Sequence, residues 1–345
     1  MRTVLVTGSA GLLGGEICGL LAERGFEVAG LVNRNTEVAR NDGSAVQGIE
    51  LVQGDITKGR LGVDEAAYGA LADRLDLIVH SAALTAFTEE SPEHRAVNID
   101  GTRNIIALAD AGGAGLLHIS TAYIAGDREG VIREGELDEG QGFTNGYEST
   151  KFEAEKLVRE ANVPFAIARP AIVLGDYAEG RTRGFETIYP ILKVFAEGRV
   201  STMPALPSAT LDLVPIDYVC EGIAEMADRF EEAKGQTFHL VSSRPTPLRA
   251  FPETLAQFDG LSSPDFVSPE SFSMEALPPA ERRFFERGAA VYARYFSRNP
   301  QFDDAGWRVF SGRSCPPTDE EWWQRLVEYA LAARFIRPPK KRSAA

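Results

Sequence analysis

Short apolar segments alternate with longer amphipathic segments through the first half of the chain. The short segments are rich in Val, Ile and Leu, whereas the longer ones repeat apolar residues at helical spacing. This alternation is typical of an α/β protein in which a doubly wound parallel sheet is covered by helices on both faces. The strands that the pattern predicts are residues 3–7, 26–33, 49–53, 76–80, 115–120 and 164–168.

The pattern becomes less regular after Gly175. The elements predicted there are, in order, a segment leading out of the sheet (172–174), an apolar helix (188–200), a loop near the substrate (203–207), a strand (238–241), an aromatic helix (281–297) and a last helix that begins at Thr318 with a capping box. We therefore expect a smaller, mostly helical region beside the sheet.

Three parts of the chain follow from this change. Residues 1–175 are the predicted sheet domain, and residues 176–335 are a substrate-binding or lid region that is partly interleaved with the sheet. Residues 336–345 form a basic tail that we expect to be disordered. The aromatic residues of the second part have two interpretations: they form the lid's own core, or some of them line an apolar substrate tunnel.

A glycine-rich turn follows the first predicted strand and precedes a helical segment. Its glycines are Gly8, Gly11 and Gly14. In a dinucleotide-binding unit, the first such glycine allows a tight turn, the second lets backbone approach a pyrophosphate, and the third lets helix pack on strand. The position of the turn, between a strand and a helix, predicts a Rossmann domain that binds a nicotinamide dinucleotide.

The end of the second predicted strand bears on the choice of cofactor. An NAD enzyme usually places an Asp or Glu there, about 20 residues after the glycines, to bind the adenosine ribose. This chain has Asn33 and Arg34 instead. An arginine can pair with a 2′-phosphate, so the sequence predicts NADPH rather than NADH; the alternative is that Arg34 is only a surface charge.

Tyr147 and Lys151 are separated by one helical turn in a Tyr-x-x-x-Lys spacing, so they lie on one face of a helix. A lysine ammonium favours the phenolate of a nearby tyrosine and would lower its pKa from the usual value of about 10. The pair is therefore a candidate for proton transfer near neutral pH. Such a spacing is common by chance, and it gains meaning only from the rest of the chain.

Four segments, taken in order, resemble those of extended short-chain dehydrogenase/reductases. They are residues 7–14, 80–83, 98–104 and 119–123, followed by Tyr147, Lys151 and the pair at 169–170. Within that superfamily the chain is more similar to fatty acyl-CoA reductases and carrier-linked thioester reductases, the male sterility protein-like members. The segments that carry this second resemblance are residues 118–126, 146–155, 211–219, 300–304 and 315–317.

The resemblance implies a reductase that transfers hydride from NADPH to an acyl thioester, giving an aldehyde and, after a second hydride, an alcohol. It assigns catalysis to Thr121, Tyr147 and Lys151, and it places Asn98 near the site. The implied cofactor-binding residues are Thr7, Gly8, Ala10, Gly11, Leu12, Leu13, Gly14, Arg34, Asp55, Ile56, Ser81, Ala82, Ala83, Tyr147, Lys151 and Pro170. The substrate would be a hydrophobic acyl group on coenzyme A or on an acyl carrier protein.

Two arginines in a glycine-flanked loop, Arg181 and Arg183, are candidates for binding phosphates of coenzyme A or of a carrier arm. The alternative is that both are solvated loop charges. The activity also has alternatives on the same scaffold: a ketone or hydroxysteroid-type oxidoreductase, or a nucleotide-sugar epimerase or dehydratase. A non-catalytic nucleotide sensor is disfavoured by the intact catalytic set.

The bulk composition excludes some classes of protein. The 345 residues carry a formal net charge of −14, which argues against binding to nucleic acid. The three cysteines, Cys18, Cys220 and Cys315, lie far apart, so we expect neither a metal site nor a disulfide. No apolar stretch approaches the ~18 residues of a membrane span, and no signal peptide is evident. We expect a cytoplasmic protein, either a monomer or a homodimer.

Overall fold

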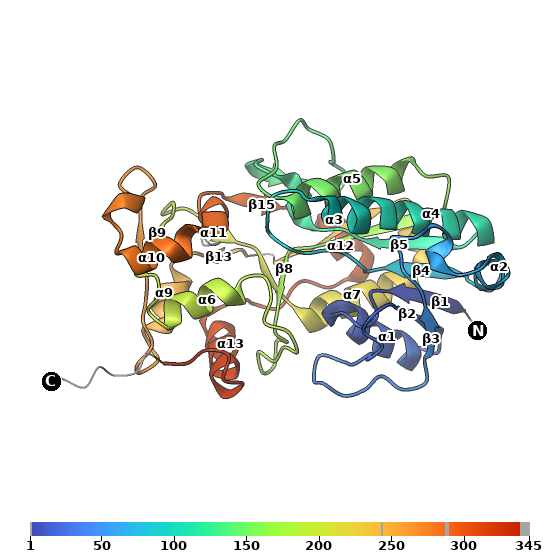
Figure 1. Cartoon of the computed structure of the whole chain (residues 1–345), viewed down its shortest axis with the longest axis horizontal. Coiled ribbons are helices and arrows are strands. Elements are labelled where there is room, and N and C mark those ends of the chain that lie inside the picture. Colours follow the sequence, from blue (N-terminus) through green and yellow to red (C-terminus); the bar gives the residue numbers. More distant parts are fainter. Residues whose placement is uncertain (1, 243, 287–289, 339–345) are drawn as a thin grey trace.

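Two lobes lie side by side in the computed structural model, which describes residues 2–242, 244–286 and 290–338 (Figure 1). One lobe contains a seven-stranded parallel sheet, and the other contains short helices and small two-stranded sheets. The large sheet has the order β12-β7-β5-β4-β1-β2-β3. Its strands are β1 (Thr3–Thr7), β2 (Glu27–Val32), β3 (Glu50–Gln53), β4 (Leu77–His80), β5 (Gly115–Ile119), β7 (Phe165–Pro170) and β12 (Thr237–Leu240).

The predicted doubly wound fold is confirmed, and each predicted strand of the sheet is present. The inner strands are buried along their whole length because helices cover both faces, which explains their continuous apolar sequences. The strand order reverses between β1 and β4. In open α/β sheets the ligand site lies outside the carboxyl ends of the strands at this reversal.

The helices of the sheet lobe form two layers (Figure 1). On one face, α1 (Leu12–Glu23) packs against α7 (Ile216–Asp228), and both contribute to the larger apolar core. On the other face lie α2 (Glu65–Ala72), α4 (Gly101–Gly112) and α5 (Gly146–Glu160). A π-helical turn at Arg95–Asp100 precedes α4, and the short helix α3 (Pro92–His94) precedes that turn.

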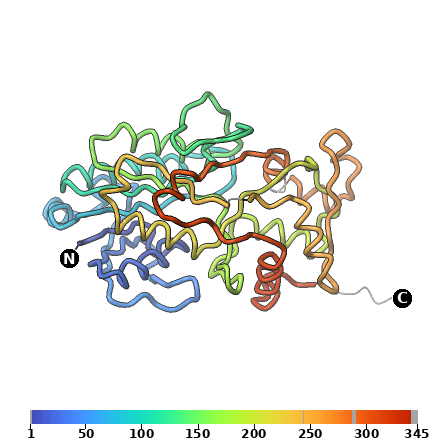
Figure 2. Tube along the Cα trace, turned by 180° about the vertical axis from the view of Figure 1, so that it is seen from behind, coloured from blue at the N-terminus to red at the C-terminus, as the bar shows by residue number. Residues whose placement is uncertain are grey.

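Segments from the second half of the chain complete the sheet lobe. Strand β12 pairs in parallel with β7, and α12 (Ala305–Ser311) packs beside it. Figure 2, which views the molecule from behind, shows the red C-terminal part of the chain running across this side of the molecule before it reaches α13 (Glu320–Ala332). Residues beyond 175 therefore belong to both lobes.

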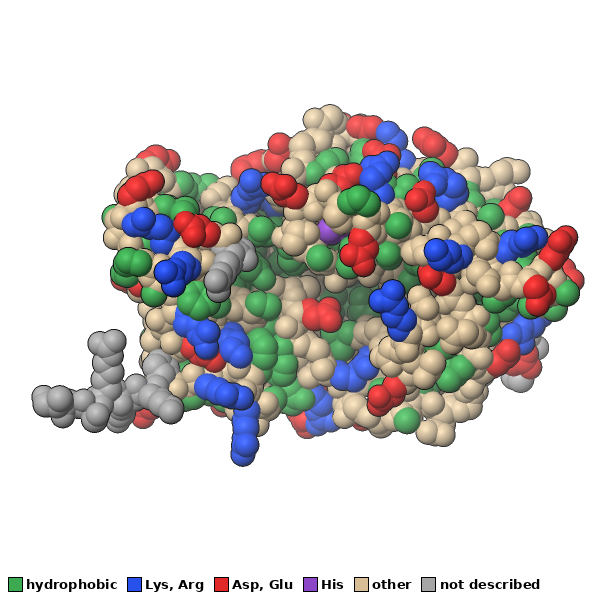
Figure 3. Space-filling model, viewed as in Figure 1, with side chains coloured by type: hydrophobic (Ala, Val, Ile, Leu, Met, Phe, Trp, Pro, Cys, Tyr) green, Lys and Arg blue, Asp and Glu red, His purple; other side chains and the backbone are tan. Residues whose placement is uncertain are grey.

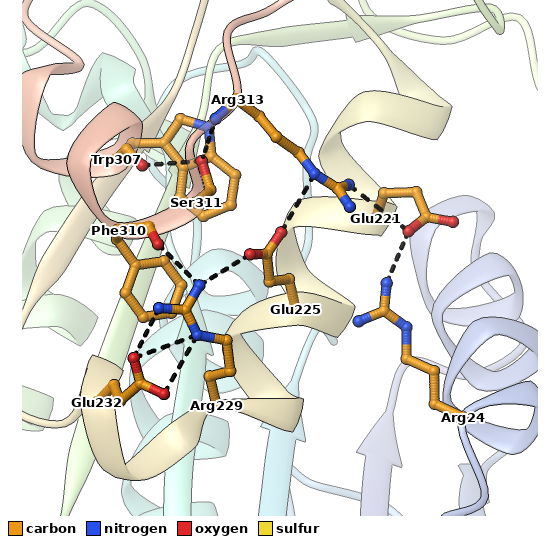
Figure 4. A network of polar contacts seen from close by, with 9 residues as sticks. All are labelled: Arg24, Glu221, Glu225, Arg229, Glu232, Trp307, Phe310, Ser311 and Arg313. Carbon is orange, nitrogen blue, oxygen red and sulfur yellow. Dashed lines mark hydrogen bonds and ion pairs between the residues drawn. The ribbon is translucent and has the colours of Figure 1, made fainter.

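A polar network fastens these late segments to the sheet lobe (Figure 4). Arg24 of α1 pairs with Glu221 of α7 at 2.7 Å, and Arg313, after α12, reaches Glu225 of α7 at 3.4 Å. Arg229 donates to the Phe310 carbonyl at 2.7 Å. Because most of these side chains are partly exposed, each pair contributes little stability, roughly 0–1 kcal/mol.

The second lobe follows the predictions less closely. Strand β8 (Ile172–Leu174) leaves the main sheet, as predicted, and pairs with β11 (Leu213–Pro215). The predicted apolar helix is α6 (Tyr189–Ala196). The loop predicted at 203–207 is wrong at its start, because β9 (Thr202–Pro204) pairs there with β14 (Asp265–Val267). Backbone pairing with a segment about 60 residues away is not visible in the local sequence.

The aromatic stretch at 281–297 is helical on both sides of residues 287–289, which lie outside the described residues: α10 is Pro279–Phe284 and α11 is Ala290–Tyr295. The last helix begins one residue later than predicted, because the side chain of Asp319, not Thr318, accepts from the Trp322 backbone. The remaining elements are α8 (Phe230–Ala233), α9 (Ala250–Leu255), β6 (Gly130–Ile132), β10 (Thr210–Leu211), β13 (Thr246–Pro247), β15 (Pro300–Phe302) and 3-10 turns at Gly59–Gly62, Ala122–Ala125 and Met274–Ala276.

In the part of the chain that the structure describes, every helix is too short or too polar to span a membrane.

Candidate active site

A cavity of about 540 Å³ runs along the carboxyl ends of the central strands, at the reversal of strand order. Figure 3 shows that the surface is hollowed between the two lobes. The structure brings nearly all of the predicted site residues to the wall of this cavity. They are Gly8, Ala10, Gly11, Leu12, Leu13, Gly14, Arg34, Asp55, Ile56, Ser81, Ala82, Ala83, Thr121, Tyr147, Lys151 and Pro170.

Thr7 is the one residue of the predicted catalytic and cofactor-binding set that does not line the cavity. It is fully buried, its hydroxyl lies 2.7 Å from Nδ1 of His80, and it accepts a hydrogen bond from the Ala82 backbone at 3.1 Å. Thr7 therefore holds the turn after β4 in place beneath the cavity.

The glycine turn has the geometry that its sequence predicts. Gly8 has φ +67°, in the left-handed region, and the Gly11 N–H donates to the Gly8 carbonyl at 2.8 Å. A Cβ on Gly14 would lie 2.1 Å from that carbonyl oxygen, so only glycine allows α1 to start this close to β1. The N-terminus of α1 thereby faces the cavity, where its free N–H groups suit a phosphate.

Arg34 and Asp55 lie at one end of the cavity, beyond the ends of β2 and β3. Arg34 is exposed. Burial raises the pKa of Asp55, but hydrogen bonds from Thr57 and the charges of Lys58 and Arg34 outweigh burial, and the pKa is lowered. Asp55 is consequently an ionised acceptor beside an arginine.

Thr121, Tyr147 and Lys151 border the other part of the cavity. Thr121 begins a 3-10 turn after β5, is buried, and donates weakly to the Pro170 carbonyl at 3.4 Å. Tyr147 is half-buried on the first turn of α5. Lys151, one turn later, is buried, and its ammonium donates to the Ile119 carbonyl at 2.7 Å.

The protonation of this pair differs from the prediction. Burial raises the pKa of Tyr147 to about 12, although a hydrogen bond from Thr121 lowers it. Burial also lowers the pKa of Lys151 to about 7, against the charge of Glu155. The predicted lowering of the Tyr147 pKa is therefore not seen in the surroundings that the chain alone provides, because desolvation, which disfavours both charged forms, dominates.

Two buried histidines lie beneath Lys151, and the sequence analysis missed their role. Nε2 of His118 is 3.3 Å from the Lys151 ammonium, while Nδ1 of His118 has no partner among the described residues. The ring centroids of His80 and His118 are 5.4 Å apart, and the His80 ring lies between the hydroxyls of Thr7 and Thr102. Burial lowers the pKa of both histidines, so neutral rings support the lysine.

A buried ionic cluster joins the start of α5 to the second lobe. Glu148 is fully buried and accepts from the Tyr295 hydroxyl at 2.6 Å and from Arg298 at 3.2 Å. Asn145, the N-cap of α5, also donates to the Tyr295 hydroxyl at 2.9 Å. Glu148 follows Tyr147 directly, but its partners are about 150 residues away, and no local pattern indicates them.

Asn98, predicted to lie near the site, binds both backbone groups of Leu84, accepting at 2.8 Å and donating at 3.1 Å. It also donates to the Thr150 hydroxyl at 2.9 Å. Asn98 thus connects the π-helical turn before α4 with the segment after β4 and with α5.

Neither Arg181 nor Arg183 lines a cavity that the structure describes. Arg181 pairs with Glu179, and Arg183 donates to the Gly11 carbonyl at 2.7 Å. Asn41 holds the same loop by binding the backbone of both arginines, at 2.8 Å and 3.2 Å. Arg183 thereby fastens the loop to the glycine turn, whereas Arg181 is paired within the loop; the assignment of both arginines to phosphates of the substrate stays a prediction.

A second cavity, of about 480 Å³, adjoins the first on the side of the second lobe. Phe284 and Tyr292 line it, whereas Phe285 and Phe296 are buried in the lobe's core. The aromatic stretch thus supplies both core residues and residues that line a cavity, and the prediction that this cavity holds the substrate stays a prediction.

The chain is similar to known proteins in sequence. The model of the family described as "Male sterility protein" matches residues 6–223. The chain is 27% identical over 282 residues to glycine betaine reductase ATRR of Emericella nidulans, covering 74% of this chain and 22% of that protein. It is 26% identical over 257 residues to probable fatty acyl-CoA reductase 4 of Arabidopsis thaliana, covering 57% of this chain and 52% of that protein. The chain thus spans at most about half the length of these two relatives.

The fold is also similar to solved structures. The terminal R domain from the myxalamid PKS-NRPS biosynthetic pathway superposes with a TM-score of 0.82 at 26% identity, covering 99% of this chain and 93% of that domain. A UDP-glucuronic acid 4-epimerase from Bacillus cereus, solved with NAD, has a TM-score of 0.68 at 17% identity, covering 96% of this chain and 99% of that one. The second likeness shows the fold alone.

Proposed function

Because the chain belongs to the male sterility protein family, we propose that it is an NADPH-dependent reductase of acyl thioesters. The observation that carries the proposal is that one cavity is lined by the glycine turn, by Thr121 and by the Tyr147–Lys151 pair. A carbonyl placed beside Tyr147 would therefore lie next to a dinucleotide held at the glycine turn. The names of the relatives, a fatty acyl-CoA reductase and a terminal R domain, support a thioester as the carbonyl.

The residues present fit a nicotinamide dinucleotide. Gly8, Gly11 and the N-terminus of α1 would hold the pyrophosphate, and Asp55 with Ile56 would border the adenine. When bound, the cofactor supplies the hydride that adds to the thioester carbonyl carbon.

The chain's own residues would manage the charge that hydride addition creates. Negative charge develops on the carbonyl oxygen, and the hydroxyls of Thr121 and Tyr147 would stabilise it by hydrogen bonds already in place. With a pKa of about 12, Tyr147 is protonated at neutral pH and is available as the proton donor. The resulting hemithioacetal collapses to an aldehyde and a free thiol. A charged Lys151 would stabilise the phenolate that remains until Tyr147 is reprotonated.

The preference for NADPH is part of the proposal. Arg34 lines the adenosine end of the cavity, is exposed, and has no ion-pair partner among the described residues. Its guanidinium is therefore free to pair with a 2′-phosphate. The thioester could be carried by coenzyme A or by a carrier protein, and both present the same phosphopantetheine arm.

The experiment is a spectrophotometric assay of NADPH and NADH oxidation with acyl-CoA and acyl-pantetheine thioesters, together with a ketone and a nucleotide sugar. We expect oxidation of NADPH that depends on the thioester and is lost in Tyr147→Phe. Turnover of the ketone or the nucleotide sugar, with none of any thioester, would replace this proposal with one of the alternatives on the same fold.

A further inference from the structure

The two cavities share one boundary. Four residues line both of them: Thr85, Phe87, Glu186 and Thr187. A group that reacts beside Tyr147 can therefore extend past this boundary into the second cavity. A thioester whose acyl end occupies the second cavity passes between Phe87 and the Glu186–Thr187 turn.

Charge is distributed unevenly along this path. Among the residues that the structure describes, Glu186 is the only charged one that lines the second cavity. The charged residues lining the first are Arg34 and Asp55, at the adenosine end, the catalytic Lys151, and again Glu186. Beyond the catalytic lysine, the path past the boundary meets a carboxylate and no lysine or arginine among the described lining residues.

The Glu186 carboxylate is available for a ligand. Its side chain has no hydrogen bond and no ion pair with any residue that the structure describes, although Glu179, in the same loop, pairs with Arg181. Glu186 is exposed, so its charge is solvated rather than buried. A solvated carboxylate can exchange water for a cation at modest cost.

The backbone holds this turn in an unfavourable conformation. Thr187 has φ +55°, a left-handed value that is rare for a β-branched residue. The Tyr292 hydroxyl donates to the Thr187 carbonyl at 2.7 Å, and the Tyr189 N–H donates to the Glu186 carbonyl at 3.1 Å. The Thr187 hydroxyl oxygen is buried and has no partner among the described residues. The turn is thus fixed with a carboxylate and an unsatisfied hydroxyl at the boundary.

Aromatic rings stand across from this turn. Phe87 contacts the rings of Tyr147 and Tyr295, with centroids 5.8 Å and 5.7 Å away. An ammonium group is favoured by a carboxylate and by the faces of aromatic rings, whereas a carboxylate is disfavoured by both.

We propose that the acyl group reduced by this protein carries a protonated amine, which binds Glu186 at the boundary between the two cavities. This inference rests on the proposed function and narrows its substrate class from acyl thioesters in general to aminoacyl thioesters. The apolar wall of the second cavity, which includes Ile191, Val194 and Phe284, accepts the hydrocarbon part of the acyl group. An acyl group that ends in a carboxylate is a poor substrate.

The test compares pantetheine thioesters that differ only in the amine. The set is octanoyl, 2-aminooctanoyl, 8-aminooctanoyl and the N-acetyl form of each amino compound, each assayed for kcat/KM of NADPH oxidation. We expect one of the two amino compounds to exceed octanoyl by about 5–30-fold, as an attraction of 1–2 kcal/mol would give, and acetylation to remove the gain.

Glu186→Gln should bring the ratio of the amino compound to octanoyl close to one, and Glu186→Lys should invert it. Glu179→Gln is the matched control, because it removes a carboxylate of the same loop that lines neither cavity, and its ratio should equal that of the unsubstituted protein. Each ratio compares two substrates of the same variant, so a change in that variant's total activity does not affect the result.

Equal turnover of octanoyl and both amino compounds, or a preference that survives in Glu186→Gln, would overturn the inference and leave the thioester reductase proposal intact. Failure of every thioester, with turnover of another carbonyl, would overturn the proposed function and the inference with it.

Discussion

The two lobes contribute different kinds of groups to the same cavity. The sheet lobe offers backbone groups of the glycine turn and the proposed catalytic set, whose members follow strands or lie on α5. The second lobe offers Glu186, in a turn that the Tyr292 hydroxyl holds, and Tyr295, which binds the distant Glu148. The first arrangement is fixed by local sequence and suits a constant ligand. The second depends on tertiary packing between segments that are far apart in the chain.

The largest expected effect lies on the sheet side. Tyr147→Phe removes the proton donor and one hydrogen bond to the developing oxyanion, so kcat should fall by about 10²–10⁴-fold. Binding of NADPH, measured by quenching of protein fluorescence, should change little. Unchanged kcat would show that the proton comes from another group and that the sheet lobe does not supply the proton donor through Tyr147.

The next largest expected effect is on stability and concerns the connection between the lobes. Arg298→Ala leaves the buried Glu148 carboxylate without its cation, which should cost about 3–5 kcal/mol in the free energy of unfolding. Arg313→Ala is the matched control, because its ion pairs in the network of Figure 4 are half-exposed and should cost at most about 1 kcal/mol. Urea unfolding of both variants measures the difference. Equal losses would mean that the Glu148 cluster does not hold the lobes together.

The protonation of Lys151 predicts a pH dependence. Its pKa is lowered to about 7, so the ammonium is present below that pH and is lost as the pH rises through it. Because the charged lysine stabilises the phenolate of Tyr147, kcat/KM should fall up to about tenfold per pH unit above neutrality. Lys151→Arg stays charged, so its weaker activity should lack this fall. A flat profile between about pH 6 and pH 9 in the unsubstituted protein would contradict the assignment.

The smallest effect concerns the choice of cofactor. Arg34→Ala should reduce the preference for NADPH over NADH by about tenfold, since it removes a charge-assisted contact with the 2′-phosphate. Arg74→Ala, whose guanidinium pairs with Glu50 on the outside of the lobe, is the control and should leave the ratio unchanged. If Arg34→Ala also leaves it unchanged, the 2′-phosphate is not bound there.

The sequence predicted the sheet lobe well because its signals are local. Gly8 and Gly14 are required by backbone geometry within a single turn, and Tyr147 and Lys151 are one helical turn apart. The same reasoning could not find the Glu148–Tyr295 bond, the strand at Thr202–Pro204 or the support of Lys151 by His118, since each joins residues far apart in the chain. Desolvation, which raises the pKa of Tyr147, is likewise a property of the folded surroundings.

The proposed reduction of a thioester at Tyr147, between the two lobes, is best tested by following free thiol and NADPH together in one reaction with an acyl-pantetheine thioester. We expect one thiol released for each aldehyde formed, two NADPH oxidised per thiol if alcohol is the product, and neither signal in Tyr147→Phe. Release of thiol without oxidation of NADPH would indicate a thioesterase, and oxidation of NADPH without thiol would indicate a different carbonyl; either result would contradict the claim.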